Sequence, residues 1–437
     1  MGVLCMTVGP KTAPGQPPAA QQSALRTALA GLIGNVLEWF DFAVYGYFAS
    51  DIGHQFFPKS DPTAQQLLAF AVFGIGFLVR PVGGLALGMV GDRIGRRALL
   101  TLSIALMGAA TLLMGLLPTY ESIGVMAPML LVTMRLLQGF SLGGEFTGSM
   151  VYTTEKASPM MRGLISSSTA VGTTLGFILG SGSAWLINRW LSVAEVSVWG
   201  WRIPFIGSVL FCVAGYFLRR GISETEAGLK AKEIRPPLLP SLISDWVPIL
   251  QTFGIVSMTN AAYYLTFTYM VERRKTITGE GGETFLLATV LSLLVVLVSK
   301  PFGGWLSDHT GRRRLMILLQ VVTMSLVYVA LRLMLYGSPM QFTYGQILLA
   351  VPIGMALGLQ GAMVVEIFPL RTRVTSMSFA YSITLALAGG TAPLVSTWLI
   401  ERLGQPLAPA YYIMLHGLIG LALMLPMKET NLRSLDE

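Results

Sequence analysis

Residues 88–97 read Gly88-Met-Val-Gly-Asp92-Arg93-Ile-Gly95-Arg96-Arg97, and residues 304–313 read Gly304-Trp-Leu-Ser-Asp308-His-Thr-Gly311-Arg312-Arg313. Both stretches follow the pattern G-x-x-x-D-x-x-G-R-R, and they begin 216 residues apart. A second repeated pattern follows each of these two stretches along the chain. Glu155 precedes Arg162 by seven residues, and Glu366 precedes Arg373 by seven residues. The chain is therefore predicted to consist of two related halves.

Composition indicates that most of the chain lies in lipid. Of the 437 residues, 53% are hydrophobic and only 12% are charged, whereas soluble proteins average about 25% charged residues. A helix that crosses a bilayer needs about 20 mostly apolar residues. Twelve stretches meet or nearly meet this requirement: 25–50, 67–90, 99–117, 123–152, 164–190 and 201–218, then 246–270, 285–306, 315–335, 346–368, 374–400 and 410–427.

The predicted fold class is an all-α membrane protein with twelve transmembrane helices in two pseudo-symmetric six-helix bundles. Residues 1–22 are rich in Pro, Gln and Ala and are predicted to form a disordered cytoplasmic tail. The first bundle is expected at 23–220, a cytoplasmic linker at 221–245, and the second bundle with a short cytoplasmic tail at 246–437. Duplicated halves favour alternating access, with a substrate near the membrane midplane between them.

The positive charges predict an orientation in the membrane. With the N-terminus inside, nineteen Lys and Arg residues fall in inside segments and seven in outside segments. This asymmetry is typical of cytoplasmic loops. Both termini are therefore expected in the cytoplasm, and the chain is expected to be a multi-pass protein of a bacterial plasma (inner) membrane. The net charge of +8 lies largely in these loops and does not indicate nucleic-acid binding.

Catalytic and metal-binding patterns do not stand out in the sequence. There is no His cluster, nucleophile elbow or P-loop, so neither an enzyme nor an ATP-driven pump is predicted. Cys5 and Cys212 are too few and too far apart to suggest a metal site or a disulfide framework. The expected partners are a small solute, a proton and the lipid bilayer. No cofactor, metal or nucleic acid is expected, and the protein is expected to be a monomer.

Charged residues within the predicted spans mark candidate functional positions, because each costs about 2.5–3.5 kcal/mol to insert. Glu38 and Asp41 are three residues apart in the first span and share a face, which Asn35 extends. Two close carboxylates in a low dielectric resist ionising together, so one of them can hold a proton. The alternative is that one acid pairs with a buried arginine and never titrates.

Arginines in the second and fourth spans are the candidate partners of a carboxylate. Arg80 lies near mid-depth in the second span, and Arg135 lies about ten residues into the fourth. Arginine stays charged and presents a planar fork to a carboxylate. We expect one to neutralise an acid of the first span and the other, Arg135 by preference, to contact the substrate. The alternative is that both are structural counter-ions. Lys300 and Arg332 are expected to extend toward lipid headgroups, without a functional role.

The second half offers neutral polar and aromatic residues within its spans. Asn260, Tyr263 and Tyr264 lie in the seventh span, Gln360 in the tenth and Tyr381 in the eleventh. They could orient a substrate by hydrogen bonds or surround an ammonium group with aromatic faces. The alternative is that the tyrosines anchor the helices at the membrane interface.

The repeated loop resembles the signature of the major facilitator superfamily, and the repeat extends over the whole chain. Four further stretches resemble the metabolite:proton symporter family: Gly34-Asn35-Val-Leu-Glu38-Trp39-Phe40-Asp41-Phe42, Phe77-Leu-Val-Arg80-Pro81, Gln138-Gly139-Phe-Ser-Leu-Gly143-Gly144-Glu145 and Gly200-Trp201-Arg202-Ile-Pro204-Phe205. Among the members of this family, Asn260-Ala-Ala-Tyr263-Tyr264 resembles the proline/betaine transporters. Arg135 is a departure, since it resembles the organic-acid members and the osmolyte carrier has Lys there.

The resemblance implies a proton-coupled importer of a small carboxylated or zwitterionic solute, such as proline or glycine betaine. A symporter of an organic acid of the 2-oxoglutarate, citrate or shikimate type, or an exporter of the same fold, are the alternatives. Arg135-Leu-Leu-Gln138-Gly139 matches a fourth-helix motif that the superfamily links to proton transfer. The implied proton-coupling residues are Glu38, Asp41, Arg135 and Glu145, although Glu145 fits a helix-packing role equally well.

The resemblance and the polar residues together define two more candidate sets. The substrate-binding set is Asn35, Arg80, Arg135, Gln138, Asn260, Tyr263, Tyr264, Gln360 and Tyr381. The repeated loops are expected to act as cytoplasmic latches, unless their arginines only fix the topology. This gating set is Gly88, Asp92, Arg93, Gly95, Arg96, Arg97, Glu155 and Arg162, with Gly304, Asp308, Gly311, Arg312, Arg313, Glu366 and Arg373 in the second half.

Overall fold

The computed structural model describes residues 35–58, 61–94, 96–220, 242–279, 283–369, 373–431, 433 and 435. The predicted tail, 1–22, and most of the predicted linker, 221–241, lie outside the described residues. Every regular element among the described residues is helical. The predicted all-α class is therefore confirmed.

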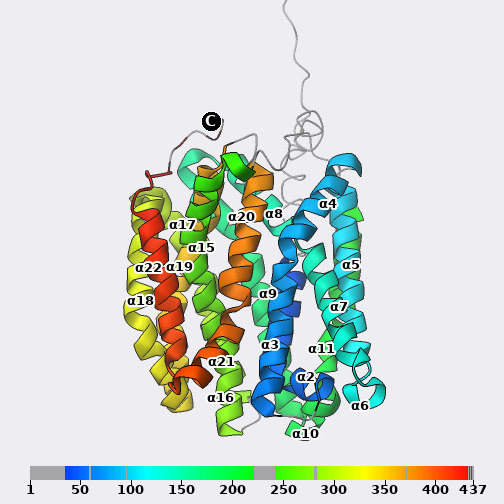
Figure 1. Ribbon diagram of the computed structural model, residues 1–437. Coiled ribbons are helices and arrows are strands. Elements are labelled where there is room, and N and C mark those ends of the chain that lie inside the picture. Colours follow the sequence, from blue (N-terminus) through cyan, green and yellow to red (C-terminus); the bar gives the residue numbers. More distant parts are fainter. Residues whose placement is uncertain are drawn as a thin grey trace, which may run out of the picture.

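Helical passes form the first half of the chain among the described residues (Figure 1). Most passes consist of more than one element, because short breaks interrupt them. The first comprises residues 35–47 and α2 (Ala49–Phe56). The others are α3 (Pro62–Leu78) with α4 (Arg80–Ile94), α5 (Arg96–Leu116), α7 (Met126–Ser141) with α8 (Glu145–Lys156), α9 (Arg162–Trp190), and η2 (Val196–Gly200) with α11 (Arg202–Gly207) and α12 (Val209–Arg220); the short helices α6 (Tyr120–Ile123), η1 (Pro159–Met161) and α10 (Val193–Glu195) connect them.

Six further passes form the second half. The seventh and eleventh each contain a π-helical turn between two α-helices. In order along the chain the passes are α15 (Trp246–Tyr264) with η3 (Leu265–Tyr269) and α16 (Met270–Thr278), α17 (Glu283–Thr310), α18 (Arg312–Tyr336), α19 (Pro339–Ile367), α20 (Arg373–Thr384) with η4 (Leu385–Gly390) and α21 (Ala392–Leu403), and α22 (Ala408–Met424).

Length and apolarity alone identify fewer membrane-spanning helices than twelve. Seven helices among the described residues qualify, or eight if the bent pair Val193–Gly200 and Arg202–Ala214 counts as one span. Two further apolar helices are short, Leu102–Leu116 and Ala408–Met424. The remaining passes either begin at the edge of the described residues or are divided by π-helical turns.

Local sequence explains where several helices begin and end. Asp61 caps α3 by accepting a hydrogen bond from the Thr63 backbone N–H at 3.1 Å, and Pro62 follows it. Ser338 and Gln341 form a reciprocal capping box at the start of α19. α16 and α21 are each followed by a glycine in the left-handed conformation, Gly279 and Gly404.

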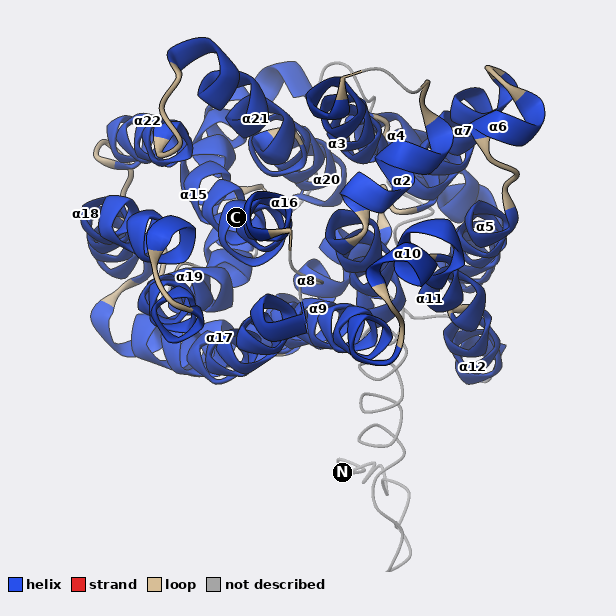
Figure 2. Cartoon of the chain, turned by 90° about the horizontal axis from the view of Figure 1, so that it is seen from below, coloured by secondary structure: helices blue, strands red, loops and turns tan. Residues whose placement is uncertain are grey.

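The two halves lie side by side, with the second half on the left and the first half on the right of Figure 1. Seen from below, α17 of the second half lies beside α9 of the first half (Figure 2). We call the upper end in Figure 1, where α17 turns into α18, the motif end, and the end with α2 and α16 the opposite end. The buried core continues from one half into the other.

Candidate functional site

Glu38 and Asp41 lie in the first helix, residues 35–47, and form separate ion pairs. Arg80 Nη2 lies 2.7 Å from Glu38 Oε1, and Arg135 Nη1 lies 2.8 Å from Asp41 Oδ2. All four side chains are at most 2% exposed. Each acid therefore has its own guanidinium partner, which reduces the repulsion expected between two close carboxylates.

The Asp41 pair belongs to a network built only from the first half. Gln138 Nε2 donates to Asp41 Oδ1 and to Thr111 Oγ1, both at 2.9 Å, and Arg135 Nη1 donates to Gln138 Oε1 at 2.9 Å. The Arg135 guanidinium also lies 3.8 Å from the ring centroid of Tyr45. Sequence analysis placed Gln138 with the substrate and preferred Arg135 as its contact. The structure places both around Asp41.

The Glu38 pair lies where the first half meets the second. Arg80 is the first residue of α4, directly after the break at Val79 that ends α3. The charges of Arg80 and Glu38 both act on the hydroxyl groups of Tyr264 and Tyr381, which belong to the second half. Nε and Nη1 of Arg80 have no hydrogen-bond partner among the described residues. This guanidinium can therefore accept a further anion.

Aromatic rings line the same inter-half region. Trp39 stacks on Tyr264 with 6.2 Å between ring centroids, and Phe77 meets Tyr264 edge-on at 5.5 Å. Phe177 meets Tyr263 edge-on at 4.9 Å. Faces of this kind attract ammonium groups. The predicted tyrosines are thus buried between the halves, which contradicts their alternative placement as interface anchors.

The remaining predicted substrate residues include several polar atoms without a protein partner. Gln360 Nε2 donates to the Tyr381 hydroxyl at 2.9 Å, while Asn260 Nδ2 donates to the Val256 carbonyl at 2.9 Å. Gln360 Oε1, the Tyr264 hydroxyl and both amide atoms of the buried Asn35 have no hydrogen-bond partner among the described residues. Buried polar atoms normally find partners, so these mark places for a solute or water.

Asp308 joins the halves at the motif end. Its two carboxylate oxygens accept hydrogen bonds from the backbone N–H groups of Gly163 and Leu164 at the start of α9, at 2.8 and 3.0 Å. Arg312 Nη1 lies 3.0 Å from Asp308 Oδ1, and Arg312 Nε lies 2.6 Å from Glu366 Oε2. The second copy of the repeated loop therefore contacts the first half, and its buried Arg312 lies between two acids.

The structure explains why glycine is needed at two positions of the second loop. Gly311 has a φ of +93°, a conformation that side chains rarely adopt, in the turn between α17 and α18. A Cβ at Gly304 would clash with the carbonyl oxygen of Gly163, so glycine there permits the close crossing of α17 and α9.

The backbone of the first copy of the loop is described except at Gly95, but its side chains are not. The backbone of Gly88, Asp92 and Arg93 continues α4, and Arg96 and Arg97 begin α5, but their side chains are not described. Gly95 and the side chains of Glu145 and Glu155 are also outside the described part. The roles predicted for these residues remain predictions.

The carboxyl-terminal segment contacts the predicted gating arginines at the motif end. Arg162 Nη1 donates to the Arg433 carbonyl at 2.6 Å, and Arg373 Nη2 donates to the Leu435 carbonyl at 2.7 Å. Arg313 donates to the carbonyls of Met424 and Leu425. Burial alone would raise the pKa of the Glu429 carboxyl. Backbone N–H groups of Arg313, Thr430 and Arg312 donate hydrogen bonds to this carboxyl and hold its pKa below the ordinary value.

A second inter-half network closes the opposite end, and sequence analysis missed it. Lys275 Nζ lies 2.8 Å from Asp51 Oδ2, and the Ser50 backbone N–H donates to Glu272 Oε1 at 3.0 Å. Both contacts join α2 to α16. The sequence shows Lys275 only as one of three consecutive cations after an apolar span, so nothing in the pattern identified its acidic partner.

The prediction that Lys300 extends toward headgroups is wrong. Lys300 is 1% exposed, and its ammonium contacts α9 of the other half. Its position 17 residues after the start of α17 was a signal, because a lysine so deep in an apolar helix cannot reach either interface. Arg332 is exposed, as expected.

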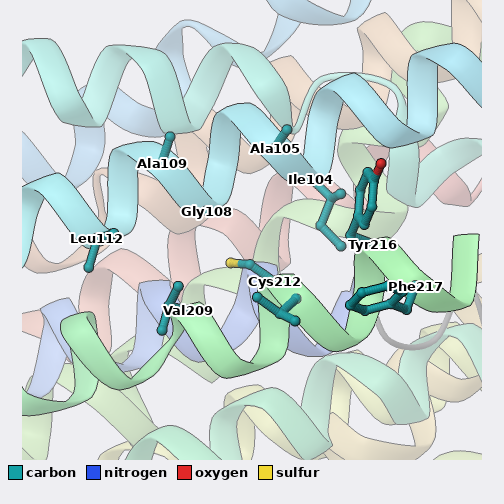
Figure 3. A pocket seen from close by; sticks show the side chains of 10 residues that line it. Ile104, Ala105, Gly108, Ala109, Leu112, Val209, Cys212, Tyr216 and Phe217 are labelled. Atoms are coloured by element: carbon teal, nitrogen blue, oxygen red, sulfur yellow. The ribbon is translucent and has the colours of Figure 1, made fainter. Parts of the chain in front are cut away.

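An apolar pocket of about 350 Å³ lies between α5 and α12, and none of the four residues of the two ion pairs lines it (Figure 3). Its lining is almost entirely aliphatic and aromatic, with Cys212 Sγ and the Tyr216 hydroxyl as its polar side-chain atoms. A charged solute would be poorly stabilised there. The inter-half region is therefore the better candidate site.

Comparison with known proteins agrees with this architecture. Residues 27–227 match the family described as Sugar (and other) transporter, and residues 275–433 match the Major Facilitator Superfamily. The structure of the proton:xylose symporter XylE bound to 6-bromo-6-deoxy-D-glucose aligns with a TM-score of 0.77 and 16% identity, covering 95% of this chain and 98% of that one. The fold is that of a major facilitator transporter with twelve helices in two bundles.

Relatives in sequence identify the family. The Proline/betaine transporter of Escherichia coli (strain K12) is 34% identical over 428 residues, covering 94% of this chain and 85% of that protein. The Citrate-proton symporter of Klebsiella pneumoniae is 35% identical over 392 residues, covering 89% and 88%. The chain belongs to the major facilitator superfamily and, within it, to the metabolite:proton symporter family. It is a multi-pass membrane transporter and not an enzyme.

Proposed function

We propose that this protein is a proton-coupled symporter that imports a small carboxylated zwitterion, of the proline or glycine betaine type, by alternating access. The observation that carries the proposal is the division of the buried charges into two ion pairs. The Asp41 pair is enclosed within the first half, whereas the Glu38 pair faces aromatic residues of the second half. One pair suits a proton and the other a solute.

The proton is assigned to Asp41. Its carboxylate accepts from Arg135 and Gln138 with no exposure to solvent. Protonation removes the negative charge, and Arg135 then loses its anion in a low dielectric, which strongly favours a rearrangement. Because Asp41 lies in the first helix, such a rearrangement can move that helix relative to its own half.

The solute is assigned to the region of Arg80, Glu38, Trp39 and Tyr264. A carboxylate can occupy Nε and Nη1 of Arg80, which lack partners among the described residues. An ammonium group can lie against the stacked rings of Trp39 and Tyr264, with Glu38 nearby. Both arginines contact an acid and both have nitrogens without a partner among the described residues. Because Arg135 is enclosed within the first half whereas the Arg80 pair faces the second half, Arg80 replaces it as the proposed substrate arginine.

Alternating access is assigned to the two networks at the ends of the helices. Asp308 joins the halves at the motif end, and Lys275 with Asp51 joins them at the opposite end. We assign the motif end, with Arg312, Arg313 and Arg314, to the cytoplasmic side of a bacterial inner membrane, and both termini with it. This placement makes the opposite end the entry for an imported solute.

A second candidate substrate is a di- or tricarboxylate. The relative from Klebsiella pneumoniae is named a citrate-proton symporter and is as similar as the proline/betaine relatives. The fold is equally compatible with export.

The test is uptake into proteoliposomes under an imposed inward proton gradient, with proline, glycine betaine, citrate, 2-oxoglutarate and shikimate as probes. We expect accumulation of proline or glycine betaine that a protonophore abolishes. Accumulation of citrate alone would select the second candidate. Substrate loss that an outward gradient drives would select an exporter, and no transport of any probe would refute the proposal.

A further inference from the structure

Lys300 is a buried cation that the proposed function does not use. It lies in α17, and its Nζ donates to the Ala170 carbonyl at 2.6 Å and to Thr173 Oγ1 at 2.9 Å, both in α9 of the other half. The Thr173 hydroxyl itself donates to the Ala170 carbonyl at 2.7 Å, so its lone pairs are free to accept from the ammonium. Lys300 is thus held by two neutral oxygens across the inter-half boundary.

Lys300 lacks the acidic partner that four other buried or partly buried cations have among the described residues. Arg80, Arg135, Arg312 and Lys275 each contact a carboxylate. No carboxylate contacts Lys300 among the described residues. A buried ammonium with only neutral acceptors lacks the compensation that an anion would give. The site is therefore suited to bind an anion when one is available.

The position of Lys300 places it on the path between the solute site and the motif end. Its ammonium lies 5.9 Å from the ring centroid of Tyr263, which packs against Phe177 in the solute region. Asp308 follows eight residues later in the same helix, so Lys300 lies about 12 Å farther from the motif end than Asp308. Separation of α9 and α17 at this end would remove both oxygen partners of Lys300 at once.

We propose that Lys300 is a second carboxylate-binding position, which becomes available when α9 and α17 separate at the motif end. While that end is closed, the ammonium of Lys300 donates hydrogen bonds to the two oxygens of α9. When the motif end opens, the solute's carboxylate replaces the two oxygens of α9. The solute then has a second binding position between Arg80 and the exit at the motif end. This role rests on the proposed carboxylated substrate and adds a residue that sets affinity on one side of the membrane.

The test compares Lys300→Gln with Thr173→Val in vesicles of both orientations, with proline as the probe. Lys300→Gln keeps a donor but removes the charge, whereas Thr173→Val weakens the closed contact but keeps the charge. We expect Lys300→Gln to raise the KM for proline at the motif end about tenfold, the loss expected for one charge-assisted contact. Its KM at the opposite end, and both KM values of Thr173→Val, should change by less than about twofold.

The conservative variant Lys300→Arg separates loss of charge from misfolding, and its motif-end KM should stay within about threefold of wild type. If Lys300 only fastens the halves together, Lys300→Gln and Thr173→Val would change both KM values alike, which would overturn the proposal. Prolinamide, which lacks the carboxylate, should inhibit wild type and Lys300→Gln equally from the motif side.

A measurement without substrate separates this inference from the proposed function. In a background with Cys5→Ser and Cys212→Ser, Lys300→Cys should react with a membrane-impermeant anionic thiosulfonate added at the motif end. Ser292→Cys, buried two turns farther from that end, is the control. If wild type transports no probe, the proposed function fails, but the labelling experiment still tests whether position 300 is accessible to an anion from the motif end. Equal labelling at 300 and 292 would overturn the carboxylate site.

Discussion

The Asp41 carboxylate has two donors, Arg135 Nη1 and Gln138 Nε2, and both would lose their anion if it accepted a proton. Gln138 can turn to Thr111, which it already contacts. Arg135 keeps its contact with Gln138 Oε1 and the faces of Tyr45 and Phe42 as partial compensation, none of which is an anion. A single proton therefore changes the interactions of the first helix, α5 and α7 together.

We expect Asp41→Asn to lose proton-driven accumulation and to keep solute exchange, because the amide imitates the protonated acid and cannot release a proton. Accumulation under an inward proton gradient should fall to the level without a gradient. Counterflow should remain within about threefold of wild type, since the solute region is unchanged. Glu38→Gln is the matched control and should weaken exchange as well. An Asp41→Asn variant that still accumulates solute would exclude Asp41 as the coupling residue.

We propose that Arg80 binds the solute and Arg135 takes part in proton coupling, and the contribution of the Arg80 guanidinium can be tested separately. Arg80→Lys keeps a positive charge for Glu38 but removes the planar fork offered to a carboxylate. We expect the Kd for the solute, measured by calorimetry, to rise about tenfold. Arg135→Lys should change coupling more than affinity. If only Arg135→Lys weakened binding, the solute carboxylate would belong at Arg135.

At the scale of elements, the passes that line the inter-half region are broken close to the candidate residues. The α3–α4 pass breaks at Val79, directly before Arg80. The π-helical turn η3 begins directly after Tyr264, and η4 begins four residues after Tyr381. π-helical turns frequently occur at functional sites because they shift side chains from the regular register.

The sequence predicted the elements better than their partners. The repeated loops and the apolar runs identified two halves and twelve passes, because both signals are local. Sequence analysis expected one of Arg80 and Arg135 to neutralise an acid of the first span and the other to contact the substrate, whereas in the structure each of them pairs with an acid. Which arginine pairs with which acid depends on the packing of the first helix against α4 and α7. That packing, like the contact of Lys300 with α9, joins residues more than 40 positions apart and leaves no local pattern.

Asp308 connects two helices, because its side chain accepts hydrogen bonds from the start of α9 and pairs with Arg312 of the next helix, α18. In Asp308→Asn, one oxygen can still accept a backbone hydrogen bond, while the second bond and the negative charge that pairs with Arg312 are lost. Loss of a helix cap costs about 0.5–2 kcal/mol. We expect the transport rate to fall about tenfold while equilibrium affinity stays within about threefold.

The control for Asp308→Asn is Asp61→Asn, which alters an exposed cap of α3 that does not cross the halves. It should leave the transport rate unchanged. A large loss of solute binding in folded Asp308→Asn protein would contradict a gating role, because Asp308 lies about 12 Å from Lys300 and still farther from Arg80.

At the scale of the whole molecule, the halves contact each other at both ends of the helices. Gly304 and Gly163 allow a close crossing at the motif end, and Lys275 with Asp51 fastens the opposite end. Transport requires that these contacts break alternately, because simultaneous opening would leave a channel. Arg80 and Tyr264, in the proposed solute region between the two ends, are both buried in this arrangement.

The alternation can be measured with two pairs of spin labels in the background with Cys5→Ser and Cys212→Ser. Met161 and His309 are exposed on opposite halves at the motif end, and Leu68 and Ile277 are exposed on opposite halves toward the other end. Asp308→Asn removes a bond that exists only when the motif end is closed. We therefore expect this substitution to lengthen the Met161–His309 distance and to shorten or preserve the Leu68–Ile277 distance. Asp51→Asn, which removes the acid paired with Lys275, should produce the reverse pattern.

Pulsed electron spin resonance on both pairs tests whether the two ends open alternately, because a rocking motion of two rigid halves links the two distances. Lengthening of both distances in the same variant would show independent opening of the two ends, and the paired networks would then be stabilising contacts rather than alternating gates.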